Sequence, residues 1–360
     1  MPARHCHFVL LQFDVDIDSS EAFYCMLNVI QFQTSYQHCR MHLFMSICVL
    51  ALLVCVSFGS QVNYLQKLVK KKKFEVDNLL RNHQDLDDPL VMRMSYMASH
   101  NQFEVTKALK RPGDGEENLH TMSVLCDLKR RSPTIPSNRN ILEFSSASKF
   151  AEVLTLAQVD GFLINTEPYE YGGSMEELKE CVQVSRAARP QNPPCLVQKD
   201  LIIHPVQIAK ALEEGASGVL IIMAVVGADL EPLLDACTIM GTEAIVEVHS
   251  PEELDYALSK GATIFLVNMW DRMTGVLHKE QAKGLASMMP MNAVSIAAGD
   301  IGSLEEAAEL AFYGYDSVVL GRRIADMPDI KDYIDGVHSI VGPPRGMSSG
   351  GMKSMLPGLG

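Results

Sequence analysis

Between Ser123 and Arg323 the chain alternates short apolar runs with helical segments, and this alternation restricts the folds that it can adopt. A strand that is buried on both faces of a parallel sheet reads as a near-continuous run of Val, Ile and Leu. Runs of this kind cover residues 123–129, 161–166, 194–199, 218–226, 244–249, 263–269, 293–298 and 317–321. Strict strand–helix alternation favours a parallel sheet with right-handed crossovers, and eight such units predict an α/β fold, the (β/α)8 TIM barrel.

The intervals between the runs carry signals for helix ends. Glycine is preferred just after the last turn of a helix, whereas serine followed by acidic residues is preferred at the start. Glycines stand at the expected helix ends at positions Gly215, Gly241, Gly261 and Gly314. Ser250 and Ser303 stand at two expected helix starts, each followed by acidic residues. These signals support helices in the intervals.

A doubly wound open sheet is the rival fold. That fold requires a glycine-rich phosphate-binding turn after its first strand. The first run here leads instead into the segment KRRSPT, which contains no glycine. The barrel is therefore favoured, and barrels of this kind carry their active sites at the carboxyl ends of the strands.

Four of the apolar runs end on polar side chains, namely Lys129, Lys199, Glu247 and Asn268. A buried strand gains nothing from such an end unless it opens into a site, and a buried carboxylate without a partner is costly. Structural alternatives stay open: Lys129 adjoins two arginines and suits a solvated turn, and Lys199 precedes Asp200 and suits an ion pair. The joint placement of all four at strand ends indicates a candidate active site.

Composition narrows the function classes. The formal net charge of −13 and the isoelectric point near 5.3 argue against nucleic-acid binding, which needs a basic surface, but they are compatible with an anionic small substrate. The nine cysteines include no C-x-x-C pair and no zinc-ligand spacing, so we expect reduced, buried thiols in an intracellular protein. His204 and His249 follow strand ends but match no metal triad, so we expect structural or solvent-facing roles for them and no bound metal.

Both ends of the chain differ from the middle. Residues 1–60 lack periodicity, and their apolar stretch 43–58 is shorter than the roughly 20 residues that a membrane span needs. Acidic residues precede this stretch, unlike in a normal signal or transit peptide. We expect an irregular extension that is a targeting segment or an incorrectly assigned start, rather than a membrane anchor. The tail at 342–360 is rich in Gly, Ser, Met and Pro and is expected to be flexible.

Residues 61–122 are expected to form N-terminal helices and a loop that cover the barrel, which itself spans 123–341. Leucines and valines at helix-like spacing predict a helix over 64–81. Proline and glycine predict a short helix followed by a polar loop over 84–118. The lysines at 70–73 are expected on a solvated helix face rather than at an anionic surface.

Longer motifs then connect the chain to a known family. The segments DLKRRSP, TEPYEYGGS, CLVQKDLIIHPVQI, EEGASGVLII, IVEVHSPEEL and LVNMWDRMTG follow one another as in indole-3-glycerol-phosphate synthase. The resemblance covers roughly residues 64–340 and is most specific in QKDLIIHPVQI and EVHSPEEL. It implies a carbon–carbon lyase of tryptophan biosynthesis that closes the indole ring on 1-(2-carboxyphenylamino)-1-deoxyribulose 5-phosphate, with loss of CO2 and water. It implies no metal and no organic cofactor.

The resemblance also implies roles for individual residues. Lys199 would be the general acid at the substrate oxygen, and Lys129 would hold the substrate carboxylate and share the acid role. Glu247 would act as a general base or stabilise the dehydrating intermediate, and Asn268 would orient the substrate and that glutamate. Asp127 stands at the acidic position of the family's first-strand E-x-K motif.

A phosphate-binding set follows from the same resemblance. Ser132, Gly299 and Gly321 would present backbone N–H groups to the substrate phosphate, as the ends of barrel strands commonly do. Arg322 would add a charge-assisted contact. The alternative reading is that Arg322 and Arg323 are surface residues that cap the last strand.

The chain departs from the family pattern at several positions. Asp127 is one methylene shorter than the glutamate of the family, which predicts a shorter reach. Ala297 and Ala298 replace a carboxylate and a hydroxyl on the seventh strand. Trp270 stands where the family has an arginine, although Arg272 follows two residues later.

These departures keep other functions open. A paralogue that kept the barrel but lost turnover would serve as a binding or assembly protein. A different phosphosugar reaction in the same barrel is compatible with the retained lysines and glutamate. Stand-alone synthases of this family act in plastids in plants and algae, so the resemblance implies a plastid stroma location, with the cytoplasm as the alternative. No feature indicates an oligomeric state.

Overall fold

The structure, a computed structural model, describes residues 65–98, 103–112, 120–132, 146–272, 275–327 and 329–343. The expectations for residues 1–60 and for the tail beyond residue 343 lie outside these ranges. The first helix covers residues 65–82 and precedes the helices α3 (Pro89–Ser95) and α4 (Glu104–Leu109).

The barrel elements follow in strict alternation. The strands are β3 (Ser123–Leu128), β4 (Gly161–Asn165), β5 (Cys195–Lys199), β6 (Gly218–Ile222), β7 (Glu243–Val248), β8 (Ile264–Asn268), β9 (Val294–Ala298) and β10 (Ser317–Leu320). The main helices are α5 (Ala147–Leu156), α6 (Met175–Ala188), α7 (Pro205–Glu213), α9 (Leu230–Ile239), α10 (Pro251–Ser259), α11 (Glu280–Ala286), α12 (Leu304–Phe312) and α13 (Ile330–His338). Short elements are α8 (Met223–Val226), η2 (Gly227–Asp229) and η3 (Arg322–Asp326).

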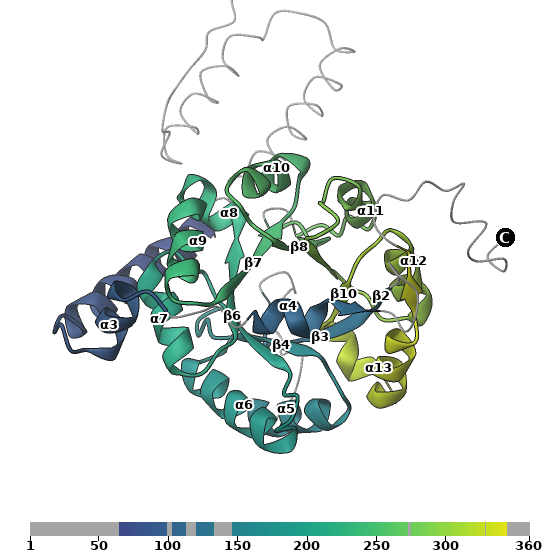
Figure 1. Ribbon diagram of the computed structural model, residues 1–360, viewed down its shortest axis with the longest axis horizontal. Helices are drawn as coiled ribbons and strands as arrows, with labels where there is room; N and C mark the ends of the chain where they lie inside the picture. The colour runs from purple at the N-terminus through teal and green to yellow at the C-terminus, as the bar shows by residue number, and fades with distance from the viewer. Residues whose placement is uncertain are drawn as a thin grey trace, which may run out of the picture. The chain divides into compact units, whose positions relative to one another are not determined.

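The eight strands form a closed parallel barrel in the order β10-β3-β4-β5-β6-β7-β8-β9. Figure 1 looks along this barrel and shows the ring of strands with the helices that alternate with them outside it. The predicted (β/α)8 barrel is confirmed. One strand boundary was wrong: the apolar run 218–226 is a strand only to Ile222, and residues Met223–Val226 turn into α8, because an apolar run alone does not separate a strand from a buried helical turn.

The predicted helix ends are confirmed. The four expected C-terminal glycines all adopt positive φ, which a residue with a Cβ atom adopts only at a cost: Gly215, Gly241, Gly261 and Gly314. Ser250 and Ser303 are N-caps, and each side-chain hydroxyl accepts a hydrogen bond from the backbone N–H three residues later. Local sequence chemistry therefore fixes where the crossover helices begin and end.

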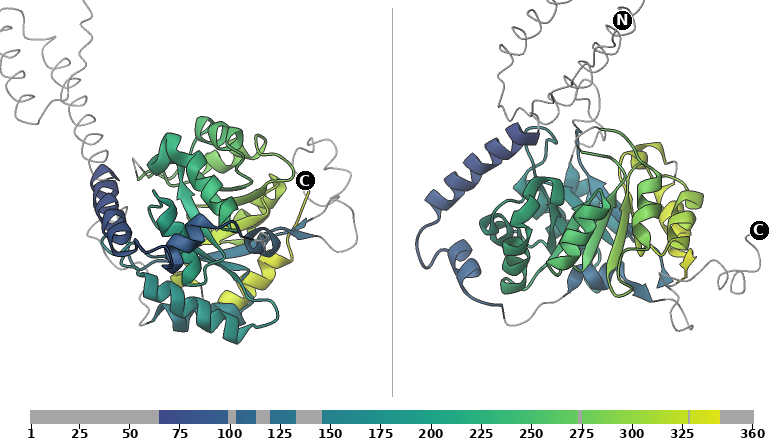
Figure 2. Two further views of the ribbon diagram at one scale, coloured as in Figure 1. Left: turned by 60° about the vertical axis from the view of Figure 1, so that its left-hand side comes forward. Right: turned by 90° about the horizontal axis from the view of Figure 1, so that it is seen from above.

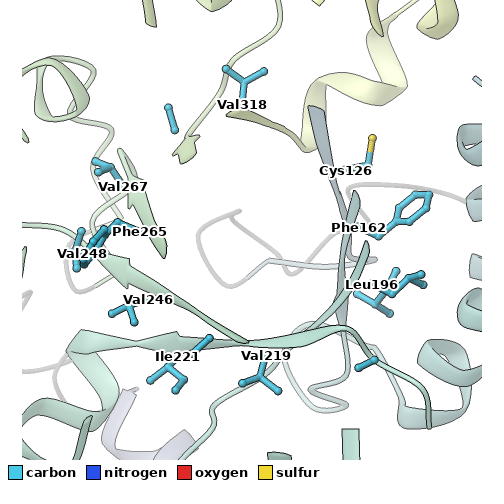
Figure 3. Packing of buried hydrophobic residues seen from close by; sticks show 14 of the residues in the cluster. Cys126, Phe162, Leu196, Val219, Ile221, Val246, Val248, Phe265, Val267 and Val318 are labelled. Carbon is cyan, nitrogen blue, oxygen red and sulfur yellow. The ribbon is translucent and has the colours of Figure 1, made fainter. Parts of the chain in front are cut away.

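Alternation along each strand divides the core into two layers. Side chains such as Val246 and Val248 point outward and pack under the surrounding helices, as Figure 3 shows for several strands. Their neighbours Ile245 and Glu247 face the barrel interior, where apolar side chains of all eight strands form a second cluster. Successive residues of a strand face opposite sides, so the sequence decides for each position whether it serves packing or the interior.

Helix α4 closes the end of the barrel at which the strands begin. Its Val105 and Leu109 are fully buried and belong to the interior cluster. Phe103, the N-cap of α4, provides no side-chain hydrogen bond to the helix. Instead the Glu243 carboxylate at the start of β7 accepts hydrogen bonds from the backbone N–H groups of Val105 (2.8 Å) and Thr106 (3.1 Å). The polar loop expected over 84–118 thus contains a second short helix with a packing role.

Two further features complete the described fold. A small antiparallel sheet pairs β1 (Arg111–Pro112), β2 (His120–Thr121) and β11 (Val341–Gly342), which brings the segment before β3 beside the segment after α13. The helix of residues 65–82, purple in Figure 2, confirms the predicted helix over 64–81. Within the residues that the structure describes, no helix has the length and apolarity needed to cross a membrane.

Truncation of Leu109 should destabilise the barrel, because Leu109 lies on helix α4, the plug that closes the end of the barrel at which the strands begin. Leu109→Ala removes a fully buried side chain and should lower the free energy of unfolding by about 2–5 kcal/mol, because the cavity is enclosed by α4 and the strands. Leu156→Ala is the matched control, since Leu156 is 59% exposed and its truncation should change stability by less than about 0.5 kcal/mol. Urea unfolding followed by circular dichroism measures both, and equal effects of the two variants would contradict the role of α4.

Candidate active site

All nine residues predicted for the site line one pocket at the carboxyl ends of the barrel strands. They are Asp127, Lys129, Ser132, Lys199, Glu247, Asn268, Gly299, Gly321 and Arg322. Barrel closure brings them together from six strand ends, although they are spread over about 200 residues of sequence.

The two-residue period of the strands explains why these side chains face the pocket. Lys199 ends β5 and follows the interior residue Val197 by two positions. Glu247 on β7 follows Ile245 in the same way. Asp127 and Asn268 likewise follow interior leucines of β3 and β8 by two positions. Each predicted polar residue therefore continues an inward-facing apolar row into the mouth of the barrel.

Asp127 joins the two lysines. Its Oδ2 atom lies 2.7 Å from Lys129 Nζ and 2.9 Å from Lys199 Nζ. The Asp127 side chain is buried, and its Oδ1 atom has no hydrogen-bond partner among the described residues. The aspartate is thus long enough to hold both ammonium groups, and the structural alternative of a Lys199–Asp200 pair is replaced by a Lys199–Asp127 pair.

The shared carboxylate sets the charge of the cluster. Burial raises the pKa of Asp127, but Lys129 and Lys199 outweigh this effect and lower it to about 2. Burial lowers the pKa of Lys129 to about 8, with Lys199 acting in the same direction and Asp127 against it. Asp127 is therefore ionised at neutral pH, and Lys129 changes its charge just above it.

Glu247 is held on the opposite side by cationic and amide donors. Arg272 makes two parallel hydrogen bonds to its carboxylate, through Nε to Oε1 and through Nη2 to Oε2, the latter at 2.6 Å. Asn268 Nδ2 donates to Oε1 at 3.2 Å. His249 Nε2 lies 3.1 Å from the same oxygen. This paired geometry fixes the orientation of the carboxylate.

These neighbours determine how Glu247 ionises. Burial raises its pKa, but Arg272 and then His249 outweigh that effect, so the pKa lies well below its usual range. Burial lowers the pKa of His249, but hydrogen bonds with Glu247 and Glu253 raise it to about 9. Glu247 is therefore a firmly ionised carboxylate, and His249 is a largely buried cation between Glu247 and Glu253 rather than a solvent-facing residue.

Arg272 and Tyr171 belong to the site but carry no strand-end signal in the sequence. Arg272 lies in the loop after β8, and its Nη1 atom donates to the Tyr171 hydroxyl at 3.0 Å. Tyr171 lies in the loop after β4, whose shape is set by Glu167: this carboxylate accepts hydrogen bonds from three backbone N–H groups, including that of Tyr171 at 3.0 Å. Gly173 completes the turn, since a Cβ there would lie 1.9 Å from the Asn165 carbonyl oxygen.

The expectation that both alanines of the seventh barrel strand, β9, stand at site positions is wrong. Both alanines replace family site residues in the sequence comparison, but only Ala298 lines the pocket. Ala297 is fully buried in the outer layer under the helices, because it faces the opposite side of the strand. Asp300, two residues after the strand, lines the pocket and adopts a φ of 58°, so a carboxylate still stands near this strand end.

The candidate phosphate-binding residues surround the ends of β9 and β10. At Gly299, φ is 132° and a Cβ would lie 2.7 Å from the Cβ of Met269, so only glycine fits there without strain. Gly321 lies near Asp127, and a Cβ added at Gly321 would make only ordinary van der Waals contacts with that side chain. The Arg322 guanidinium stacks over the Trp270 ring at 4.3 Å from the ring centroid. Arg322 therefore faces the pocket and is not a simple surface cap.

The N-terminal helix reaches the same pocket. Leu65 and Leu68 line it, and Lys72 Nζ lies 2.9 Å from Asp200 Oδ1, next to Lys199. The expectation that the lysines at 70–73 are all solvated is wrong for Lys72, which is 4% exposed. A charge run does not show which of its members faces inward, and here the helix turns one lysine toward a buried carboxylate.

His204, the other histidine singled out in the sequence, has a structural role. The described residues hold no metal-binding cluster. His204 is the N-cap of α7, and its Nδ1 atom accepts a hydrogen bond from the backbone N–H of Val206 at 3.1 Å, which agrees with the structural alternative. Across the described ranges, no group of three or more His, Cys, Asp or Glu side chains is arranged to hold a metal ion.

Known proteins with sequence similarity to this chain share one description. Indole-3-glycerol phosphate synthase from Opitutus terrae is 33% identical over 223 residues, which cover 62% of this chain and 80% of that protein. The enzyme of the same description from Nautilia profundicola is 28% identical over 271 residues, covering 74% of this chain and 95% of its own. These relatives are bacterial and give no support to the plastid expectation. Among solved structures, 3-hexulose-6-phosphate synthase from Salmonella typhimurium aligns with 61% of this chain and 98% of its own, with a TM-score of 0.46 and 14% identity.

A family model gives the decisive comparison. The model described as indole-3-glycerol phosphate synthase matches residues 65–337, which include the N-terminal helix, all eight barrel strands and every predicted site residue. This chain belongs to the indole-3-glycerol phosphate synthase family.

Proposed function

We propose that this protein closes the indole ring of 1-(2-carboxyphenylamino)-1-deoxyribulose 5-phosphate, with loss of CO2 and water, as a carbon–carbon lyase of tryptophan biosynthesis. The observation that carries the proposal is the pair of lysines on one buried aspartate, which faces a firmly ionised glutamate across a single pocket. Attack of an aromatic carbon on a carbonyl needs an acid at the oxygen, and the later loss of water needs a second acid or a charge stabiliser.

The lysines divide the acid work. Lys199 protonates the oxygen at which the ring closes. Asp127 orients the Lys199 ammonium group, with 2.9 Å between Asp127 Oδ2 and Lys199 Nζ. Lys129 binds the carboxylate that is lost as CO2 and shares the acid role. Its pKa of about 8 suits proton donation at neutral pH, since a donor is most effective when its pKa lies near the working pH.

Of the two roles considered for Glu247, electrostatic stabilisation is favoured over proton abstraction. A carboxylate that is held by Arg272 and whose pKa lies well below its usual range is a weak base. The same ionised group stabilises positive charge that develops on the substrate nitrogen during dehydration. Asn268 keeps it in position through the 3.2 Å hydrogen bond.

The phosphate is bound at the ends of β9 and β10. Backbone N–H groups of Gly299 and Gly321, together with Ser132 on the loop after β3, would contact its oxygens, and Arg322 would supply the positive charge. Gly299 and Gly321 both line the pocket at these strand ends, next to Arg322, which supports this arrangement.

Binding without turnover is the second candidate function. Ala298 motivates it, because this position lines the pocket and offers no polar group where the family has one. Calorimetric titration of substrate, run beside a turnover assay, separates the two functions. Tight binding without product would favour the binding protein, whereas product formation would exclude it.

Lys199 is the most direct test of the chemistry. The full chain should convert the substrate to a product with indole fluorescence, and Lys199→Ala should lower kcat/KM by about 10²–10⁴-fold, because the acid at the ring-closing oxygen is lost. Lys179→Ala is the matched control, since the Lys179 side chain is 45% exposed and pairs with Glu214 outside the pocket, so its activity should stay unchanged. Absence of indole product from the unaltered chain would refute the proposal.

The pH dependence of turnover should report Lys129. With a pKa of about 8, Lys129 is charged below pH 8 and loses its proton as the pH rises, so kcat/KM should fall above about pH 8. Lys129→Arg keeps a positive charge throughout this range and should move the fall to higher pH, whatever its effect on the maximal rate. Rate profiles from pH 6 to 10 measure both proteins, and an identical alkaline limb in the two would contradict this assignment.

A further inference from the structure

We propose that Trp270 is a positioning residue that holds Arg322 as the phosphate-binding arm of the pocket. The inference rests on the proposed function for the identity of the anion, and it goes beyond that function by assigning a role to Trp270. The sequence marks Trp270 as a departure from the family pattern and does not connect it with Arg322. The structure joins them in one contact, with 4.3 Å between the guanidinium carbon and the ring centroid.

Arg322 differs from the other cations of the pocket in its partners. Lys129 and Lys199 share Asp127, and Arg272 is bound to both oxygens of Glu247. Arg323 lies 3.7 Å from Asp300. Arg322 forms no ion pair or hydrogen bond with any residue in the described part of the chain, so its N–H donors remain available for a ligand.

The Trp270 ring provides a fixed platform for this side chain. The backbone N–H of Trp270 donates to Asn268 Oδ1 at 3.1 Å, and Trp270 forms an isolated antiparallel bridge with Leu277. Both contacts restrict the backbone at the end of β8. Asn268 is the same residue that orients Glu247, so the platform and the charged centre of the site share one anchor.

Stacking suits an arginine that must bind an anion. A guanidinium over an aromatic face is attracted by the electrons of the ring. This contact involves no anionic oxygen, so the N–H fork of the guanidinium can still bind two oxygens of a phosphate. Trp270 therefore restricts the rotation of Arg322 and leaves its hydrogen-bond donors free. An anionic partner such as Asp or Glu would occupy those donors.

Position favours the phosphate over the carboxylate of the substrate. Arg322 directly follows Gly321 at the end of β10, and both line the pocket together with Gly299 from the end of β9. The substrate carboxylate is assigned to Lys129, beside Asp127. The two anionic groups of the substrate need separate cationic partners. Lys129 is assigned to the carboxylate, and Arg322, which is not part of the Asp127 cluster, remains for the phosphate.

Binding of inorganic phosphate tests the inference without turnover. Calorimetry on the full chain should show phosphate binding that Arg322→Leu weakens by at least about tenfold, as expected for loss of a charge-assisted pair. Trp270→Leu, which keeps an apolar side chain but removes the aromatic face, should weaken it by about three- to tenfold. Trp270→Phe keeps an aromatic face and should stay within about twofold of the unaltered protein.

A double-mutant cycle separates positioning from packing. In the Arg322→Leu background, Trp270→Leu should have no further effect on phosphate affinity, because Trp270 acts through Arg322. The inference would be overturned by an equal loss in both backgrounds, or by equal losses in Trp270→Leu and Trp270→Phe. Because Trp270 is the only tryptophan of the chain, its fluorescence should also respond to phosphate in the unaltered protein and not in Arg322→Leu.

Two analogues distinguish the anions, and the design separates this inference from the proposed function. The substrate without its phosphate should bind equally well to Arg322→Leu and to the unaltered protein, whereas the substrate without its carboxylate should bind the variant more weakly. The reverse pattern would place the carboxylate at Arg322 and overturn the inference. If the protein turns over substrate but Arg322→Leu binds phosphate as well as the unaltered protein does, only this inference is refuted. If the phosphate affinities are as predicted but the protein forms no indole product, only the proposed function is refuted.

Discussion

Closure of the eight-stranded sheet is the constraint on which the site depends. Asp127 and Lys199 are 72 positions apart in sequence, yet they meet at 2.9 Å because β3 and β5 both flank β4 in the closed ring. The interior apolar cluster and the α4 plug hold that ring from the opposite end. Packing at one end of the barrel therefore determines the distances between charged groups at the other.

The charged groups of the pocket form two clusters, one around Asp127 and one around Glu247, in which a single carboxylate is paired with different cations. Asp127 carries one negative charge against two lysines, whereas Glu247 is held by Arg272 and by the cationic His249. Buried ion pairs of this kind contribute little net stability, because desolvation offsets the attraction. Their retention in a pocket, with a Lys129 pKa of about 8, is more consistent with proton transfer and anion binding than with folding.

Strand positions and polar strand ends could be predicted from the sequence because both follow a fixed two-residue period. That period also decides what sequence comparison missed on β9, where Ala298 faces the pocket and Ala297 does not. The contact of Arg272 with Glu247 could not be predicted, although the sequence comparison noted this arginine, because a loop has no period and the side chain reaches Glu247 from beyond the strand. Lys72 could not be singled out among adjacent lysines, because its partner Asp200 lies in a distant segment.

The central claim is that one buried carboxylate, Asp127, binds Lys129 and Lys199 together and aligns them for ring closure. Single-turnover formation of the indole product in Asp127→Asn tests it most directly, because the amide keeps the size of the side chain but removes its charge. Asp127 opposes the lowering of the Lys129 pKa, so its loss should lower that pKa further and leave the two lysine side chains without their shared ion-pair partner. The account predicts that the rate falls by about 100-fold or more in a folded protein. A rate within about twofold of the unaltered chain would contradict it.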